Sequence, residues 1–200
     1  MNEYIIKRVN GEPNWAEVPT LEVANIMWLP DVGIRMNQQI CYDETGIYVH
    51  QRCVEKNIRA EYTAPLSRVC EDSCMEFFFS IDEDGTRYVN LEINPNGCMH
   101  ASLCTHRHNT IRLAPDPIGT FQLRSARTED GWEHYYKIPV NFLQLLNPDF
   151  KMTSGRIIRA NCYKCGDLTV QPHYLTWNFV TTENPDYHRP EFFGRMVIEA

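Results

Sequence analysis

Short β-type segments separated by turn signals constrain the fold of this chain more than any other sequence feature. Their close and even spacing is typical of a sandwich or barrel built only from β-strands. The expected strands are residues 34–42, 46–53, 74–81, 86–94, 98–104, 120–126, 132–138, 157–164 and 194–199. The pattern therefore predicts an antiparallel β-sandwich with jelly-roll or Greek-key connections.

Helical periodicity is scarce in the rest of the chain. Thr20 and Asn141 have side chains suited to N-caps, and each precedes one or two turns of apolar spacing, at residues 21–27 and 142–146. Neither segment is long enough to organise a fold. No linker, internal repeat or break in composition divides the chain, so we expect one domain over residues 1–200.

The charge distribution excludes several kinds of partner. The chain has 26 acidic against 19 basic residues, a net charge of -7, and no run of lysine or arginine that could follow a phosphate backbone. No stretch approaches the ~20 apolar residues that span a bilayer. The first residues also lack the basic and apolar regions of a secretory leader. We expect no nucleic-acid or membrane partner and a cytoplasmic location, and nothing in the sequence indicates an oligomeric state.

Eight cysteines are too few in 200 residues for a disulfide scaffold, so we expect free thiols. Cys162 and Cys165 form the one Cys-x-x-Cys motif, which lacks the second pair that a zinc knuckle needs. A further group alternates along one expected strand, where ligands two residues apart are separated by nearly 7 Å. Its members are Cys98, His100, Cys104, His106 and His108. We assign no metal site and no cofactor from these patterns.

Turn chemistry sets the register of the three central strands. Residues 83–85 suit a three-residue hairpin loop with glycine in the left-handed position, which places Glu76 opposite Glu92. The next turn, residues 94–97, places His100 opposite Glu92. One face of the meander is then apolar and the other polar. The polar patch consists of Glu76, Asn90, Glu92, Asn94, His100 and Ser102.

The polar patch has three interpretations. Two opposed glutamates repel one another unless water, a cation or a hydroxyl-rich ligand lies between them, and carboxylates and amides bind the hydroxyls of sugars. Opposed strand positions are also roughly 5 Å apart, close to the carboxylate separation of retaining glycosidases. Plain exposure on the wet face of an antiparallel sheet is the third interpretation.

Three further segments carry a recognisable pattern when taken together. They are EDSCMEFFF at residues 71–79, YVNLEINPNG at residues 88–97, and residues 161–194, which end in HRPEFFG. The strand at residues 132–139 also closes on Ile-Pro before a short helix. In combination these segments resemble the family 9 carbohydrate-binding modules of the standalone bacterial type, and the likeness covers nearly the whole chain from about residue 21.

The resemblance implies a β-sandwich that grips a mono- or oligosaccharide against tryptophan. Such modules usually accompany glycoside hydrolases and often hold structural calcium, although no calcium ligand set can be identified here by spacing. Trp177 occupies the position of the family's ring platform, and Glu76 that of its hydroxyl-binding carboxylate. A second tryptophan of the family is replaced near Cys70. Another aromatic side chain would have to take its place, such as Tyr174, Tyr62 or Tyr187.

The loop before the last strand offers Tyr187, His188 and Arg189, which could clasp a polar ligand beside Trp177. Alternatively, Arg189 pairs with a neighbouring carboxylate and only locks the loop. The expected ligand-binding residues are Glu76, Asn90, Glu92, Asn94, His100, Tyr174, Trp177, Asn178, His188 and Arg189. We predict a sugar-binding protein without catalytic residues, linked to carbohydrate catabolism. The alternatives are a carbohydrate-active hydrolase using Glu76 and Glu92, and a protein-interaction sandwich.

Overall fold

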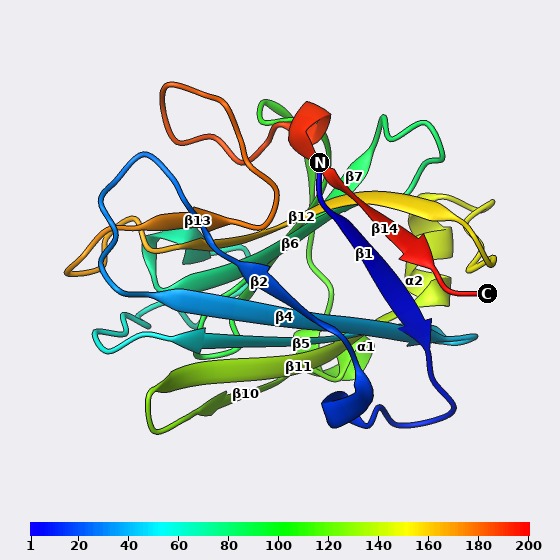
Figure 1. Cartoon of the computed structure of the whole chain (residues 1–200), viewed down its shortest axis with the longest axis horizontal. Coiled ribbons are helices and arrows are strands. Elements are labelled where there is room, and N and C mark those ends of the chain that lie inside the picture. Colours follow the sequence, from blue (N-terminus) through cyan, green and yellow to red (C-terminus); the bar gives the residue numbers. More distant parts are fainter.

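A computed structural model describes all residues, 1–200, as a mostly β structure with fourteen strands (Figure 1). The strands are β1 (Glu3–Arg8), β2 (Thr20–Val23), β3 (Asn25–Ile26), β4 (Arg35–Asp43), β5 (Gly46–Val54), β6 (Cys74–Ser80), β7 (Tyr88–Ile93), β8 (Met99–His106), β9 (Asn109–Leu113), β10 (Arg124–Arg127), β11 (Gly131–Pro139), β12 (Ile157–Cys165), β13 (Tyr174–Thr176) and β14 (Gly194–Ile198). Eleven of them form one continuous path in the order β10-β11-β5-β4-β1-β14-β12-β6-β7-β8-β9. The other three branch from it: β2 pairs with β4, and β13 pairs with both β12 and β3.

Strand β1 corrects the prediction of a purely antiparallel sandwich. Its first residues pair in parallel with β14, and its last two pair in parallel with β4, so β1 joins the two halves of a mixed, curled sheet. Figure 1 shows β1 crossing between the halves beside β14. Alternation of apolar residues gives the faces of a strand but not its direction, which is why the sequence pattern missed the parallel pairs.

The helices are short. They are α1 (Pro117–Phe121), α2 (Val140–Leu146) and three 3₁₀ turns, η1 (Trp15–Glu17), η2 (Val69–Glu71) and η3 (Pro190–Phe192). The short helix expected at residues 142–146 is confirmed as α2, although Pro139 and not Asn141 is its N-cap. The helix expected at residues 21–27 is wrong, because β2 and β3 occupy that stretch. Asp116 caps α1 by accepting a hydrogen bond from the Ile118 amide. None of the helices has the length and apolar character needed to cross a membrane.

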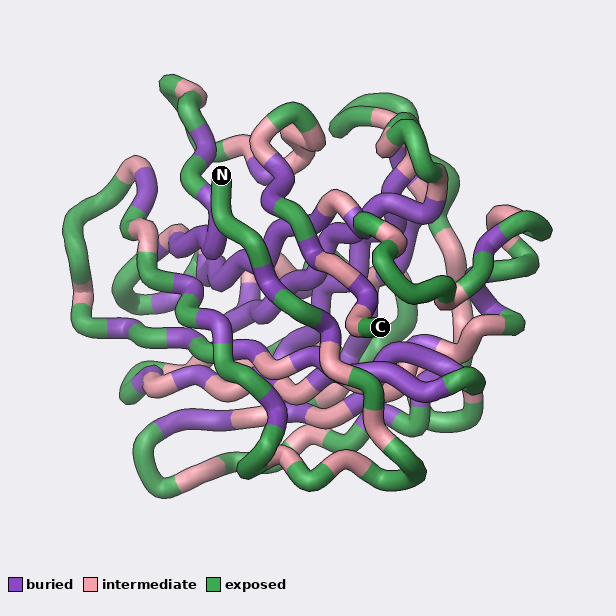
Figure 2. The backbone as a smooth tube through the Cα atoms, turned by 45° about the vertical axis from the view of Figure 1, so that its right-hand side comes forward, coloured by how far each residue is buried: buried purple, intermediate pink, exposed green.

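The main core lies between the two halves of the sheet. Ile40 and Trp132 enter it from one half, and Phe77 and Leu91 from the other. Figure 2 shows the buried backbone running through the middle of the molecule, with exposed segments at its turns. The predicted register is confirmed, with Phe77 opposite Leu91, and Gly85 has the left-handed backbone that its turn requires (φ +75°).

The opposite face of β6, β7, β8 and β12 carries a second apolar cluster, so the expectation that this face is open to water is wrong. Phe78, Tyr88 and Tyr163 project from the strands of this cluster, and Tyr187 and Phe193 cover them from the C-terminal segment. Long connections thus cover a sheet face whose strand sequences have the alternation of apolar and polar residues that is typical of a solvent-exposed face. Strand alternation carries no information about such covering loops.

Candidate functional site

A cavity of about 180 Å³ opens where the C-terminal segment meets the polar residues of β6 and β7. Its walls come from segments far apart in the sequence: Trp28 after β3, Glu76 and Glu92 on the strands, Arg107 in the β8–β9 turn, and residues 185–188. A larger hollow of about 610 Å³ lies among the loops at residues 32–34, 54–58 and 127–131, but none of its lining residues is aromatic. The smaller cavity combines rings with acids, and we therefore treat it as the candidate site.

Three aromatic rings form one wall of this cavity. The Trp28 ring meets Tyr174 edge to face at 5.5 Å between centroids and lies 5.6 Å from the Tyr187 ring. Tyr187 in turn stacks on Tyr163 at 4.0 Å, and its hydroxyl donates to the Lys164 carbonyl oxygen. The stacking and the hydrogen bond fix the Tyr187 ring, so the wall is organised before any ligand arrives.

The backbone of Trp28 has an uncommon conformation. Its φ is +55°, and the Leu29 amide donates to the Met27 carbonyl oxygen at 2.5 Å, which closes a three-residue turn around the tryptophan. A bulky residue at positive φ costs free energy and recurs at ligand sites, where the surrounding structure enforces it. Here the indole N–H of Trp28 donates to the Thr182 carbonyl oxygen at 2.8 Å, which ties the ring to the covering loop.

Two buried carboxyl groups form the floor. Glu76 and Glu92 are directly opposed in the register, as predicted, and are only 3% and 8% exposed. The Cys165 thiol donates to Glu76 Oε1 at 2.9 Å, and the Asn90 amide donates to Glu92 Oε1 at 2.9 Å. Neither carboxyl group forms an ion pair with lysine or arginine. Asn90 Oδ1 is also buried without a hydrogen-bond partner.

The environment raises the pKa of both glutamates above its ordinary value. Burial raises the pKa of Glu76 well above its usual value, and the nearby Glu92 raises it further. Burial also raises the pKa of Glu92, although His100 across the sheet opposes this. Carboxyl groups form hydrogen bonds with hydroxyls, which suits a hydroxyl-bearing ligand.

The cavity rim adds cationic and imidazole groups. Arg107 pairs with Asp186 at 3.3 Å. His188 Nδ1 lies 2.9 Å from the Tyr88 hydroxyl, and burial lowers the pKa of this imidazole to about 4, so it is neutral at physiological pH. Asp167 faces the same cavity, and burial raises its pKa while the Tyr174 hydroxyl partly opposes that shift.

Four of the ten predicted residues line the cavity: Glu76, Glu92, Tyr174 and His188. Asn90 supports Glu92 from beside it, and His100 lies opposite Glu92 in the predicted register.

Trp177 lies elsewhere, because it packs into the main core at 5% exposure and presents no face to a ligand. The backbone of Gly194 packs so closely on the Trp177 ring that a Cβ added there would lie 2.6 Å from it.

The other three predicted residues have structural contacts. The Asn94 amide donates to the Tyr62 carbonyl oxygen and to Asp72. Asn178 accepts from the Asn2 amide. Arg189 pairs with Glu191 and stays on the surface, as the loop-locking alternative supposed. These side chains hold loops together and lie outside the cavity.

The sequence reasoning missed Trp28, Arg107, Asp167 and Cys165 as lining residues. Tyr187, one of the predicted substitutes for the absent second tryptophan, does lie in the wall. Trp28 gave no sequence signal, because neither its positive φ nor its position beside Tyr174 follows from the local pattern.

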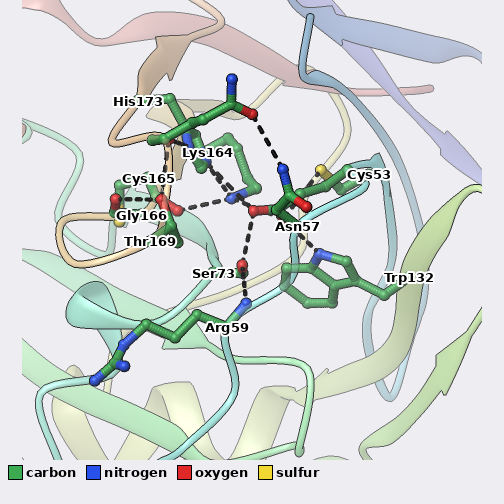
Figure 3. Close-up of polar contacts among 12 residues, drawn as sticks. Cys53, Asn57, Arg59, Ser73, Trp132, Lys164, Cys165, Gly166, Thr169 and His173 are labelled. Atoms are coloured by element: carbon green, nitrogen blue, oxygen red, sulfur yellow. Dashed lines mark hydrogen bonds and ion pairs between the residues drawn. The ribbon is translucent and has the colours of Figure 1, made fainter. Parts of the chain in front are cut away.

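A buried ion network lies next in sequence to two of the cavity residues (Figure 3). The Lys164 ammonium lies 3.2 Å from Glu55 and donates to the Cys165 carbonyl oxygen at 2.7 Å and to His173 Nε2 at 2.6 Å. Glu55 also accepts from the Trp132 indole N–H. Lys164 and His173 directly precede Cys165 and Tyr174, so the network fixes the end of β12 and the start of β13, where these two cavity residues lie.

The hydrogen bonds of this network indicate the charge states of His173, Glu55 and Lys164. His173 donates through Nδ1 to the Gln171 carbonyl oxygen and therefore accepts through Nε2, so it is neutral. Burial and the adjacent Lys164 lower the pKa of His173 to about 4. Burial alone would raise the pKa of Glu55, but Lys164 and the Trp132 N–H lower it below its usual value. Glu55 and Lys164 thus form a buried ion pair.

One group of side chains is close enough to share an ion, and its donors can be compared with those that calcium needs. Calcium takes about six to eight oxygen ligands. Cys74, Glu76 and Cys165 are the one group of three or more cysteine, histidine or acidic side chains close enough to share an ion, and two of their donors are sulfur. The calcium that the family resemblance implied therefore does not fit this group.

Three solved structures share the fold. A candidate carbohydrate-binding protein from Bacteroides uniformis superposes with a TM-score of 0.87 at 23% identity, covering 98% of this chain and 99% of that one. A family 9 carbohydrate-binding module from Caldicellulosiruptor kristjanssonii in complex with cellotriose gives 0.69 at 12% identity, covering 99% and 94%. The glucose complex of a family 9 module from that organism gives 0.70 at 13% identity, covering 99% and 96%.

No curated protein sequence matches the chain. The profile of carbohydrate-binding family 9, in contrast, matches residues 9–198. Because this match spans almost the whole sequence, the chain belongs to carbohydrate-binding family 9 and is a carbohydrate-binding module-like protein.

Proposed function

We propose that this protein binds a single glucose-type pyranose, either free or at the end of a short oligosaccharide, in the cavity between Trp28 and the Glu76–Glu92 pair. The observation that carries the proposal is an aromatic wall facing two buried acids within one cavity of a family 9 fold. Structural neighbours in this family are complexes with glucose and with cellotriose, which supports this class of ligand.

The cavity has the chemistry and the size that such a ligand needs. An aromatic ring covers the apolar C–H face of a pyranose, and carboxyl groups exchange hydrogen bonds with its hydroxyls. The volume of about 180 Å³ lies below the roughly 300 Å³ at which pockets for larger ligands begin, which favours one sugar ring over an extended chain. Trp28 takes the role of the missing second tryptophan, from a different part of the sequence.

We further propose that the protein binds its sugar without turnover and serves carbohydrate catabolism in the cytoplasm. The environment of the two glutamates supports binding, because it raises the pKa of both, whereas the two acids of a hydrolytic pair have environments that push their pKa values apart. An activated aryl glycoside tests this directly. The wild-type protein should release no aryl group from it, and release that Glu76→Gln abolishes would establish the hydrolase instead.

Calorimetric titration with glucose, cellobiose and cellotriose tests the binding site itself. Removing a stacking ring costs about 1–3 kcal/mol, so Trp28→Ala should weaken affinity roughly 5- to 150-fold. Trp15→Ala is the matched control, because Trp15 packs on His50 and Tyr135 and does not line this cavity. The control variant should bind as the wild type does.

The three sugars also distinguish the two forms of the ligand. A site for one terminal ring should bind cellobiose and cellotriose with similar affinity. Affinity that is lost in a folded Trp15→Ala protein but kept in a folded Trp28→Ala protein would move the site to another face of the molecule. No binding of any of the three by the wild type would overturn the proposed ligand class.

A further inference from the structure

Two thiols and a carboxyl group converge beneath the cavity. Cys74 and Cys165 are paired residues of neighbouring strands β6 and β12, and Glu76 lies two residues along β6 on the same face. Their donor atoms, two sulfurs and one carboxylate oxygen, all lie within 4.8 Å of one another. All three residues are buried, at 0%, 1% and 3% exposure for Cys74, Cys165 and Glu76.

This spacing fits a tetrahedral metal ion. With metal–sulfur and metal–oxygen bonds of about 2.3 and 2.1 Å, ligand atoms of a tetrahedral site lie roughly 3.6–3.8 Å apart. The Cys165 sulfur now lies 2.9 Å from Glu76 Oε1, and no pair exceeds 4.8 Å. Side-chain movements on the order of 1 Å would bring all three donors to coordination distance. Neither strand would have to move.

The surroundings leave room for a cation and one more ligand. Glu76 and Cys165 line the cavity, so the side of the group that is free of protein donors faces it. Glu92 and Asp167 add two more acidic groups to the same cavity, and the nearest buried cation, Lys164, is paired with Glu55. Arg107 lines the same cavity but pairs with Asp186, and no lysine or arginine forms an ion pair with Glu76, Glu92 or Asp167. An ion here would therefore meet acidic groups that have no cationic partner.

The two thiols of this group are not the pair of the Cys-x-x-Cys motif, although Cys165 belongs to both. Cys162 and Cys165 are three residues apart on β12, so they point to opposite faces: Cys162 enters the main core and Cys165 the second cluster. The motif therefore cannot chelate an ion. The pairing of β6 with β12 instead brings Cys165 to Cys74.

We propose that Cys74, Glu76 and Cys165 bind a thiophilic divalent cation of the zinc class, with its fourth coordination position open to the cavity. Two sulfurs and one carboxylate oxygen suit zinc and do not suit calcium or magnesium. The inference is independent of sugar binding, because the ion is held by protein donors alone. If both are correct, Glu76 contributes to both sites, and a sugar hydroxyl or water occupies the fourth position.

Cobalt(II) spectroscopy of the full-length reduced protein, without sugar, tests this site. We expect one Co²⁺ per chain, with a thiolate-to-cobalt charge-transfer band and the intense visible bands of tetrahedral coordination, both of which Zn²⁺ abolishes. Cys165→Ser and Glu76→Gln should lower Zn²⁺ affinity by more than roughly tenfold, measured by competition with a chromophoric chelator. Cys104→Ser is the control, since Cys104 belongs to the same apolar cluster but lies outside the donor group.

The wild-type spectrum decides the question even if a variant fails to fold. Absence of the thiolate charge-transfer band would overturn the proposal, because histidines on the surface can bind Co²⁺ but cannot produce that band. An unchanged band in both Cys74→Ser and Cys165→Ser would overturn it as well. Loss of sugar binding leaves the spectrum unaffected, so failure of the proposed function and failure of the metal site are separate results.

Discussion

Lys164 offers the sharpest test of the buried ion pair and of its contribution to folding stability. Its ammonium is fully buried and lies 3.2 Å from the Glu55 carboxylate. Lys164→Met keeps most of the apolar stem but leaves Glu55 buried without its cation. Removing one partner of a buried ion pair costs about 3–5 kcal/mol of folding free energy. For a chain of this length, that loss lowers the melting temperature by roughly 6–20 °C.

Urea denaturation at neutral pH measures the free energy of unfolding for this comparison. Lys151→Met is the control, since Lys151 is exposed and its loss should change stability by less than about 0.5 kcal/mol. Adding Glu55→Gln to Lys164→Met removes the buried carboxylate that has lost its cation. The double variant should therefore lose less free energy of unfolding than the sum of the two single-variant losses, by about 0.5–3 kcal/mol. A Lys164→Met protein as stable as the wild type, or strictly additive losses, would refute the ion-pair argument.

Three further predictions follow from burial. Trp177→Ala should destabilise the fold by about 3–5 kcal/mol, because the ring fills the main core, and a thermal melt that leaves the wild-type midpoint unchanged would contradict that placement. Thiol titration in denaturant should count eight free cysteines, and two or fewer would show disulfides. In the native protein only Cys70, the one cysteine that is not fully buried, should react, and it should react slowly. Burial lowers the pKa of His134 from 6.5 to about 3, so as the pH falls this imidazole is protonated in the unfolded chain before it is protonated in the folded protein. The free energy of unfolding that depends on the neutral His134 is therefore complete above pH 6.5 and is lost between pH 6.5 and about 3. His134→Gln should make urea midpoints less dependent on pH over this window.

The sequence predicted what depends on local chemistry. The register of Glu76, Glu92 and His100 follows from two turns with glycine at the correct positions and from strict alternation, and the structure confirms it. Helix α2 follows from apolar spacing over residues 142–146. Each of these features is decided within about twenty residues of the chain, where turn geometry and periodicity act directly.

The rest depends on contacts between distant segments. The parallel pairing of β1, the burial of Glu76 and Glu92 under the C-terminal loop, and the approach of Trp28 to Tyr174 all join residues far apart in the chain. No local pattern encodes these contacts. Family likeness supplied the fold class, but it placed the ring platform at Trp177, which the structure assigns to the core.

The fold shows how it neutralises a buried carboxylate when the purpose is structural. Glu55 pairs with Lys164 and accepts hydrogen bonds from the Trp132 indole N–H and the Ser73 hydroxyl. Its pKa is lowered despite burial. Glu76 and Glu92 are also buried, but Glu76 accepts a hydrogen bond from one thiol and Glu92 from one amide, and no lysine or arginine pairs with either. The pKa values of both rise. An unpaired buried acid destabilises a fold, and two opposed acids do so more. Because the same chain supplies full compensation at Glu55, the missing partners at Glu76 and Glu92 are best provided by what enters the cavity, namely sugar hydroxyls, a bound cation, or both.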